Sequence, residues 1–436
     1  ACRRPAAAAA AAIAVTNVAV VDAASGIREN QTVVLHGDRI TAIGSAASIR
    51  VPRDARVLAA RGRFLIPGLW DMHVHLSVAR QSALPVLIAN GITGVRDMGG
   101  APDEIDRWRY AIEAGTITGP RIFRAGPMLN GKAFNEFQIA VNNASEARGA
   151  ARVLRKAGAD FVKVHAAIGR DAYHGVADEC RKLAISFAGH LPRAISPEEA
   201  SDAGQASFEH LSTLFDGTLA AGIPPNELTD AMLRFRRESA PKLFRRLARN
   251  GTYFTPTLVI ERAGIDLMSP QSSANSKYIS HSAQTFTRQM QDKYKELFTS
   301  AFVARQERQF KACLPLVRLM HESGIRLLAG TDMGSSLLAP GYSLHEELAM
   351  LVEAGVPTLE VLKAATQSPA QVLGVADLGT VGEGKIADLV LLDDNPVQNI
   401  RNTKKVLAVI CRGKVFERPA LDTLLRQGEA AAQARG

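Results

Sequence analysis

The chain has 436 residues, of which 47% are apolar and 22% charged, and its formal net charge is +9. This composition is typical of a folded globular protein, and the length predicts two structural units or one large barrel with additions. No run of 18 strongly apolar residues occurs, so we expect no transmembrane helix. The densest basic run, at 232–250, predicts one amphipathic helix with a solvated face and carries no nucleic-acid-binding motif, so we expect no nucleic-acid partner.

The chain begins with ACRRPAAAAAAAIAV, and residues 1–12 read as a low-complexity tail. Ala1–Cys2 would fit the end of a lipoprotein cleavage site, although a cloning boundary would explain it equally well. The sequence therefore predicts a periplasmic, secreted or lipid-anchored envelope protein, with a cytoplasmic protein as the alternative.

The four cysteines lie far apart and form no CxxC pair. They predict neither a zinc ribbon nor a dense disulfide framework. Cys180 and Cys313 lie in helical patterns and Cys411 in a strand pattern, so we expect buried free thiols there. The fourth cysteine is Cys2.

Two β-rich pieces lie near the ends of the chain, at 13–63 and 383–418. Both show strand patterns, and the first contains hairpin-like turns at Ala-Ser-Gly and His-Gly-Asp. Neither piece alone could bury a two-sided core, so we predict that they pair into one small β-sandwich domain. Residues 419–436 are expected to form a C-terminal helix or tail.

Between these pieces, at 64–382, short β-rich runs alternate with helical patterns. This alternation predicts an α/β fold of repeated βα units, and eight such units predict a (β/α)8 TIM barrel. Ser196 is expected to cap one of the helices, and the long gap at about 260–325 predicts a helical insertion after the seventh strand. The eight runs are 64–76, 92–99, 121–129, 159–165, 184–191, 207–211, 252–259 and 326–334.

The first of these runs contains the stretch GLWDMHVHLS, at 68–77. Side chains at i and i+2 of a strand share one face, so Asp71, His73 and His75 are expected to point the same way. Burying three polar groups without partners would cost several kcal/mol. A metal ion or a hydrogen-bonded core would satisfy them.

Further polar residues fall at the ends of later runs: Lys163 and His165, His190, His210 and Asp332. In a TIM barrel these strand ends open onto one face, which holds the active site. Imidazole nitrogens and carboxylate oxygens are suitable ligands for Zn, Mn, Fe or Co. The joint pattern therefore predicts a metal site.

Lys163 raises a separate question, because an ammonium group repels divalent cations. Reaction with CO₂ would convert it to a carbamate, whose two oxygens can bridge a pair of metal ions. If Lys163 points inward, the chemistry favours a binuclear centre. If it does not, a mononuclear site of His73, His75 and Asp332 is the alternative.

With these residues in place, the chain resembles the amidohydrolase superfamily over nearly its whole length. PGLWDMHVHL matches the first-strand metal motif, FVKV the bridging lysine, GH and EH the later histidines, and GTDMG the last-strand aspartate. The C-terminal stretch GTVGEGKIADLVLLDDNP is similar as well. The resemblance is closest to the imidazolonepropionase-like branch, which includes prolidase-type enzymes and ochratoxin-cleaving amidases.

The resemblance implies two divalent ions, Zn²⁺ being the expected metal. His73 and His75 would bind one ion, His190 and His210 the other, and carboxylated Lys163 would lie between them. Asp332 would complete the first site and shuttle the catalytic proton.

The substrate contacts are less defined by this resemblance. Several peptide-cleaving relatives carry Gly-Gly-His after strand three, where this chain reads PMLNGKAFN. Their recognition of a substrate carboxylate therefore does not carry over. Arg96, Lys132 and His165 are the substitutes that we consider for contacts to an anion or a carbonyl.

The expected function is hydrolysis of an amide bond, in a peptide-like or N-acyl amino acid or an ochratoxin-type substrate, through a metal-bridging hydroxide. Hydrolysis of a lactone or another ester is one alternative. A second is deamination of a nucleobase-like ring, although mononuclear deaminases of this fold typically lack the strand-four lysine. A third is a non-catalytic scaffold. We expect a small-molecule amide as the partner, and a homo-oligomer.

Overall fold

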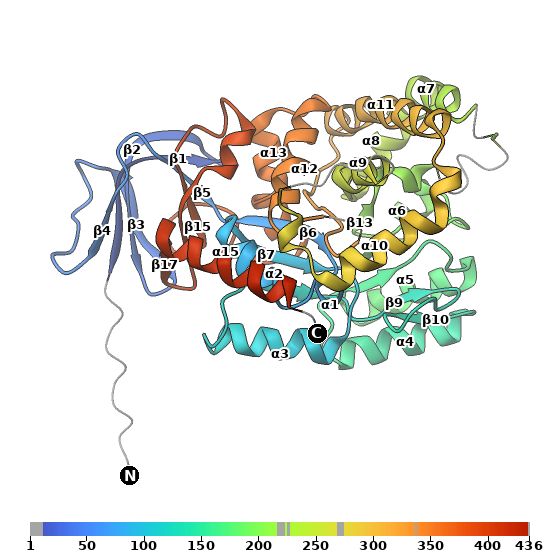
Figure 1. Cartoon of the computed structure of the whole chain (residues 1–436), viewed down its shortest axis with the longest axis horizontal. Coiled ribbons are helices and arrows are strands. Elements are labelled where there is room, and N and C mark those ends of the chain that lie inside the picture. The colour runs from blue at the N-terminus through green and yellow to red at the C-terminus, as the bar shows by residue number, and fades with distance from the viewer. Residues whose placement is uncertain (1–11, 216–222, 225–226, 268–273, 336–337, 435–436) are drawn as a thin grey trace, which may run out of the picture.

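The structure is a computed structural model that describes residues 12–215, 223–224, 227–267, 274–335 and 338–434. A β-sheet at one side of the molecule adjoins a larger α/β body, in which helices surround parallel strands (Figure 1). The prediction for Ala1–Cys2 concerns residues outside the described ranges, so it stays a prediction. In the described part of the chain, none of the helices is both long and apolar enough to cross a membrane.

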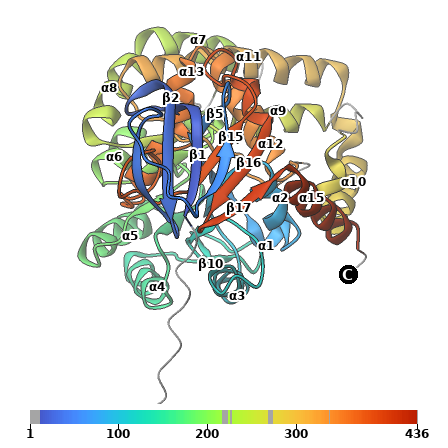
Figure 2. The same cartoon turned by 90° about the vertical axis from the view of Figure 1, so that its left-hand side faces the viewer.

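Strands from both ends of the chain form one sheet, which faces the viewer in Figure 2. They are β1 (Ile13–Asp22), β2 (Gly26–His36), β3 (Arg39–Ser45), β4 (Arg56–Ala59), β5 (Phe64–Pro67), β15 (Leu389–Leu392), β16 (Val406–Cys411) and β17 (Lys414–Glu417). The strand order is β17-β16-β15-β5-β1-β2-β3, with β4 paired to β1. The two terminal pieces therefore pair with each other, and the predicted β-sandwich stays a prediction. Because β5 pairs with β1 on one side and with β15 on the other, the two ends join in a single hydrogen-bonded sheet.

The boundary between this sheet and the α/β body differs from the prediction. Residues 64–67 form β5 in the terminal sheet, and the first strand of the body begins only at Leu69. Gly68 separates the two strands, and a Cβ at this position would lie 2.0 Å from Thr93 Oγ1. Glycine therefore permits the close approach that lets the chain pass from one sheet to the other.

The α/β body contains parallel strands, as the alternation predicted. They are β6 (Leu69–Val74), β7 (Ile92–Asp97), β8 (Arg121–Arg124), β9 (Met128–Asn130), β10 (Gln138–Ala140), β11 (Val162–Val164), β12 (Phe187–Gly189), β13 (Ser207–Glu209) and β14 (Tyr253–Thr255). One sheet has the order β6-β7-β8 and the other the order β10-β9-β11-β12-β13-β14. The class of the fold is therefore α/β with parallel sheets.

The eighth predicted strand, at 326–334, forms only isolated bridges in the described chain. Leu327 pairs with Phe254 of β14, and Met333 pairs with Val74 of β6, so the segment runs between the edges of the two sheets. Asp332 has a φ of 65°, which is incompatible with a regular strand and explains why no continuous ladder forms.

The helices lie between and after the strands. They are α1 (Leu76–Ala79), α2 (Ala83–Ala89), α3 (Pro102–Glu113), α4 (Ala144–Lys156), α5 (Arg170–Lys182), α6 (Pro197–Asp202), α7 (Leu228–Glu238), α8 (Ala240–Asn250), α9 (Leu258–Asp266), α10 (His281–Tyr294), α11 (Ser300–Glu322), α12 (Tyr342–Glu353), α13 (Thr358–Ala364), α14 (Gln367–Val372) and α15 (Arg418–Gln433). A short 3₁₀ helix, η1, covers Leu211–Leu214. Ser196 caps α6 by accepting a hydrogen bond from Glu199 N, as predicted.

Two further sequence expectations concern helices and cysteines. The basic run at 232–250 forms two helices, α7 and α8, because Pro241 cannot continue a helix from the preceding turn.

Cys180, Cys313 and Cys411 are buried and free, which confirms the prediction for them. Burial raises the pKa of each of the three thiols, so they are unreactive near neutral pH.

Candidate metal centre

The residues predicted as metal ligands come together at the carboxyl ends of the parallel strands. They are His73 in β6, His75 directly after it, Lys163 in β11, His190 directly after β12, His210 directly after β13, and Asp332 in 326–334. The ring centroid of His73 lies 5.5 Å from that of His75 and 4.6 Å from that of His210. The centroid of His190 lies 4.7 Å from that of His210. Residues separated by up to about 260 positions thus form one cluster.

Three acceptor atoms form the tightest part of this cluster. Asp332 Oδ1 lies 3.4 Å from His73 Nε2 and 3.3 Å from His75 Nε2. The ligand atoms of the three residues all lie within 4.8 Å of one another. This spacing is compatible with a single cation bound between them.

Hydrogen bonds on the far side of each ring fix the histidine tautomers. His73 Nδ1 lies 3.0 Å from Glu209 Oε2, and His75 Nδ1 lies 2.8 Å from Gly99 O. Both partners can only accept, so each Nδ1 carries the proton and each Nε2 presents a lone pair. The lone pairs point towards Asp332 Oδ1, which is buried and has no hydrogen-bond partner among the described residues. A metal cation therefore fits the donor set.

The pKa values of these groups agree with such a site. Burial, together with Lys163 and His210, lowers the pKa of His73 well below its ordinary value. Burial raises the pKa of Asp332, but His75, His210 and Lys163 lower it by more, so the carboxylate is ionised. Burial lowers the pKa of His75, but Asp332 raises it by more. A proton can therefore occupy the space between His75 and Asp332 at low pH, in competition with a metal.

A second group of nitrogens lies beside the first. His210 Nδ1 lies 2.8 Å from the Thr257 hydroxyl, and the rings of His165 and His190 are 4.2 Å apart. The Nδ1 atoms of His165 and His190 are buried without a hydrogen-bond partner in the described chain. Burial lowers the pKa of His165 to about 4, so this ring is neutral at pH 7. Neutral imidazoles with unused nitrogens are suitable for a second metal ion.

Lys163 points into the cluster, and its side chain is fully buried. Its Nζ lies 3.4 Å from His73 Nε2. Burial lowers the pKa of this amine from 10.5 to about 8, so part of it is uncharged near neutral pH. Gly189 makes room for the side chain, because a Cβ there would lie 2.9 Å from Lys163 Cδ and 2.1 Å from Val164 O.

Three residues of the site have unusual backbone angles. The φ values of His210, Thr257 and Asp332 are 67°, 49° and 65°. A non-glycine residue with such a positive φ costs on the order of 1–3 kcal/mol, and the surrounding structure must hold it in place. Residues with these backbone angles are concentrated at active sites and ligand-binding sites. Asp332 N donates to His73 O at 2.7 Å, and this bond holds the strained turn against β6.

Asp71, predicted to point the same way as His73, is satisfied by protein groups of the segment that carries Asp332. Its carboxylate accepts hydrogen bonds from Thr331 Oγ1 at 2.7 Å and Thr331 N at 3.0 Å. Trp70 and Met72, on either side of Asp71 in the sequence, belong to one apolar cluster, as the alternation along a strand predicts. Asp71 therefore fastens β6 to the segment that carries Asp332.

Arg96, predicted as a substrate contact, is a structural residue. It is 2% exposed and donates to Met72 O, Ser207 Oγ and Glu209 Oε1 at 2.7, 2.9 and 2.7 Å. These bonds occupy its guanidinium beneath the side chains predicted to bind metal. Arg96 thus holds Glu209, which in turn orients His73. Sequence analysis missed Glu209, although its place directly before His210 was a visible signal.

The other two predicted substrate contacts stay predictions. Lys132 is exposed between β9 and β10, with its Nζ 5.8 Å from the Phe134 ring centroid. His165 is partly exposed and lies against His190, at the edge of the cluster. Both positions follow strand ends on the side that carries the predicted ligands.

We expect Glu209→Gln to weaken metal binding about 10- to 100-fold. An amide cannot replace the carboxylate for both His73 and Arg96, so the imidazole loses its fixed tautomer. Metal affinity measured by competition with a chelator tests this. Glu199→Gln, which changes the partly exposed contact to His174 Nε2 at 2.7 Å, is the matched control. Equal affinities for Glu209→Gln and the wild type would contradict the assigned role.

A buried carboxyl group on α12 contacts the start of α9, close to His210. Glu347 is fully buried, and its Oε2 accepts a hydrogen bond from Val259 N at 2.8 Å. This contact fixes the start of α9, directly after the Thr257 hydroxyl that lies against His210. Burial, more than the nearby charge of Asp71, raises the pKa of Glu347 from 4.5 to about 8.

Glu347 is expected to make the folded state less stable as the pH rises. Between pH 5 and 8 the folded protein keeps a proton on this carboxyl that the unfolded chain releases, so the free energy of unfolding falls with pH in this window. Glu347→Gln does not titrate and should show a smaller fall in melting temperature from pH 5 to 8. Glu353→Gln, on the exposed side of the same helix, is the control. An unchanged pH slope in Glu347→Gln would refute the assignment.

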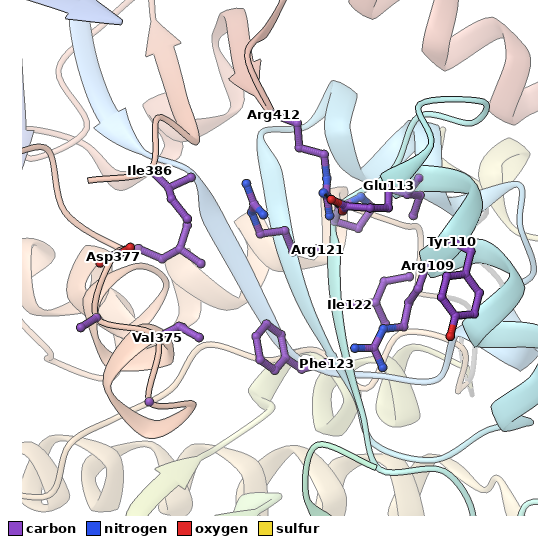
Figure 3. A pocket seen from close by; sticks show the side chains of 15 residues that line it. Arg109, Tyr110, Glu113, Arg121, Ile122, Phe123, Val375, Asp377, Ile386 and Arg412 are labelled. Atoms are coloured by element: carbon purple, nitrogen blue, oxygen red, sulfur yellow. Dashed lines mark hydrogen bonds and ion pairs between the residues drawn. The ribbon is translucent and has the colours of Figure 1, made fainter. Parts of the chain in front are cut away.

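The cavity shown in Figure 3 is not at the candidate metal centre. It has a volume of about 630 Å³ and lies where α3 and the start of β8 meet residues 374–378. The start of β8 is the opposite end of the parallel strands from the ligand cluster. Its arginines are engaged, since Arg121 pairs with Asp388 at 2.6 Å and Arg412 pairs with Glu113. We assign this cavity to the junction between the α/β body and the terminal sheet.

The fold and the cluster together define an α/β enzyme with a site that can hold a metal ion at its strand ends. A family model described as the amidohydrolase family matches residues 64–416, and the chain belongs to this family of hydrolases. This membership confirms the resemblance drawn from the sequence.

Individual relatives agree with this assignment. The ochratoxinase of Aspergillus niger is 25% identical over 401 residues, which cover 82% of this chain and 76% of that protein. A structure from Bifidobacterium longum, described as a prolidase, is similar over 97% of this chain and 100% of that chain, with a TM-score of 0.72 and 25% identity. A bottromycin amidohydrolase shares the fold over 97% of this chain and 90% of that chain, with a TM-score of 0.79 and 24% identity.

Proposed function

We propose that the protein is a binuclear metal-dependent hydrolase that cleaves an amide bond in a small molecule. The observation that carries the proposal is the buried group of His73, His75 and Asp332, whose possible ligand atoms all lie within 4.8 Å of one another. Similarity to an ochratoxinase and to a protein described as a prolidase supports an amide as the bond that is cleaved.

The proposal includes two divalent ions, with Zn²⁺ as the expected metal, and a carboxylated Lys163. His73, His75 and Asp332 would hold one ion, and His190 and His210 the other. The inward, fully buried position of Lys163 supports the carbamate, which would replace a repelling ammonium with an anionic group. The same position favours the binuclear centre over the mononuclear alternative.

Metal ions held by these residues would polarise the scissile carbonyl and lower the pKa of a bound water. The residues of the chain have separate tasks. Asp332, which is ionised, accepts the proton of the attacking water and passes it to the leaving nitrogen. Glu209 holds the Nδ1 proton of His73, so this imidazole keeps its orientation throughout the reaction.

Hydrolysis of a lactone or another ester is the second candidate, because Asp332 can return the proton to an oxygen as readily as to a nitrogen. Deamination of a nucleobase-like ring is less favoured, since a mononuclear centre gives no task to the buried Lys163.

We further propose that the two parallel sheets and 326–334 close into the predicted eight-stranded barrel. The hydrogen bond from Asp160 N to Arg124 O, at 2.9 Å, and the bridges at both ends of 326–334 support this closure. We also propose that the paired terminal β-rich pieces form a domain of their own. We propose in addition that the protein is a homo-oligomer and that it is located in the cell envelope.

The test is metal depletion and reconstitution combined with a substrate screen. The protein is stripped with a chelator, reloaded with Zn²⁺, and assayed on N-acyl amino acids, dipeptides and lactones. We expect activity to disappear on depletion, to return with two equivalents of metal, and to be highest on amides. Full activity in the stripped protein would refute metal dependence, and full activity at one equivalent would refute the binuclear centre.

A further inference from the structure

Helix α9 begins without a cap from its own first side chain. Its N-cap residue is Thr257, and a threonine at this position usually accepts a hydrogen bond from the second or third N–H of the helix. In the described chain the Thr257 hydroxyl makes no such bond. It lies instead 2.8 Å from Nδ1 of His210, a predicted metal ligand. The first N–H groups of α9 therefore need an acceptor from elsewhere in the fold.

Glu347 on α12 supplies that acceptor. Its Oε2 accepts a hydrogen bond at 2.8 Å from the N–H of Val259, the second residue of α9, which is one of the groups that a capping hydroxyl ordinarily binds. Helix α12 packs against α9, although Glu347 and Val259 are 88 positions apart in the sequence. The carboxyl group is fully buried, and its Oε1 has no hydrogen-bond partner among the described residues. Glu347 thus acts as a cap that comes from another helix.

The backbone of Thr257 shows why this cap matters. Thr257 has a φ of 49° and a ψ of 48°, and this left-handed conformation is a genuine outlier for a β-branched residue. It persists only where surrounding contacts hold it. An ordinary N-cap residue has extended angles instead, with which its own hydroxyl reaches the helix. The contact of Glu347 with α9 lets Thr257 keep the unusual conformation, with its hydroxyl at His210.

The backbone and the ring of His210 are held by separate contacts. His210 N donates to Thr255 O at 2.9 Å, and Leu211 N donates to Pro256 O at 3.0 Å, so the backbone is tied to the end of β14. The ring can still rotate about its side-chain bonds, and the Thr257 hydroxyl is the group at its Nδ1. When this hydroxyl accepts the Nδ1 proton, Nε2 presents its lone pair to a metal.

We propose that Glu347 is a positioning residue for His210: it caps α9 in place of Thr257 and so frees the Thr257 hydroxyl to accept the Nδ1 proton of this ligand. The inference rests on the proposed function, in which His210 would hold one of two metal ions, and it deepens the account of the same site. Glu347 acts on His210 through α9 and Thr257 rather than by direct contact.

Two substitutions of Glu347 separate the hydrogen bond from the packing. Burial raises the pKa of this carboxyl to about 8, so it is mostly protonated at pH 7 and offers one oxygen that only accepts. Glutamine offers the same acceptor in nearly the same shape. Methionine is of similar size but has no oxygen, so Val259 N loses its partner.

The test measures the affinity for Zn²⁺ by competition with a chelator. Thr257→Val and Glu347→Met should each weaken the binding of one ion about tenfold. The double variant should bind that ion no worse than Thr257→Val alone, because both substitutions remove the same contact to His210. Glu347→Gln should bind Zn²⁺ like the wild type. Leu348→Ala, at a fully buried neighbour on α12, is the control: it should lower the melting temperature without changing the affinity.

Three results would overturn the positioning role. They are unchanged affinity in Glu347→Met, additive losses in the double variant, and an equal loss of affinity in Leu348→Ala, which would indicate general loosening of α12. If Glu347→Met does not fold, Glu347→Asp takes its place with the same expectations, since its carboxyl is one methylene too short to reach Val259 N.

A measurement on the metal-free protein keeps this inference separate from the proposed function. The nitrogen NMR signals of the His210 ring, assigned by their absence in His210→Asn, should show the Nδ1–H tautomer in the wild type and in Glu347→Gln. Thr257→Val and Glu347→Met should show a mixture of tautomers. If the wild type bound no Zn²⁺, this pattern would support the positioning role while the proposed metal centre fails. The same tautomer in every variant would overturn the positioning role, whether or not Zn²⁺ binds.

Discussion

Asp332→Asn should lower the turnover number by on the order of 10²–10⁴ at full metal content, because it removes a general acid–base group. Asparagine has nearly the same shape, keeps one oxygen as a ligand, and is among the residues that tolerate a positive φ. The φ of 65° at this position should therefore persist in the variant. What the amide cannot do is accept the proton of the attacking water.

The pH profile separates this role from a purely structural one. Turnover of the wild type requires ionised Asp332, so it should fall as the pH drops through the pKa of this group, which is held below its ordinary value. Asp332→Asn should lack that acidic limb while the bound metal, measured by elemental analysis, stays near the wild-type amount. Asp202→Asn, at an exposed ion pair with Arg246, controls for loss of a surface charge. Near-normal turnover of Asp332→Asn at full occupancy would exclude the proton shuttle.

The coming together of these polar side chains could be predicted because they mark the ends of strands that the sequence already separates. His73, Lys163, His190 and His210 each close a short apolar run, and parallel strands bring such ends to one face. The structure brings these side chains together from four different strand ends. The physical rule that was used, the position of a polar residue at the end of an apolar run, does not depend on exact register.

The residues behind the cluster could not be predicted, because their roles depend on register and on contacts distant in the sequence. The partner of Asp71 could not be predicted, because Thr331 lies 260 residues further along the chain. Arg96 was read as a substrate contact, yet its partner Glu209 lies 113 residues further along the chain. The same limit applies to β5, whose apolar residues continue smoothly into β6 although the two strands belong to different sheets.

Lys163→Ala should lower the bound metal from two ions towards one or none. The substitution removes the amine that would carry the bridging carbamate and leaves a buried space beside His73. His190 and His210 would then face the second cation without an anionic ligand, and neutral imidazoles alone do not offset its charge. Elemental analysis of protein purified from metal-supplemented medium measures this directly.

Rescue by small acids distinguishes a carbamate from a lysine that only supports the fold. Acetate or propionate can enter the space left by the side chain and present two oxygens, so added acid should restore part of the metal content and of the turnover in Lys163→Ala. Lys156→Ala, at the exposed end of α4, should bind metal like the wild type and gain nothing from acetate. A Lys163→Ala protein with unchanged metal content would exclude the bridging carbamate and leave the mononuclear site of His73, His75 and Asp332 as the better account. Loss of metal without any rescue, in a variant with the wild-type melting temperature, would indicate that the free amine itself is the ligand.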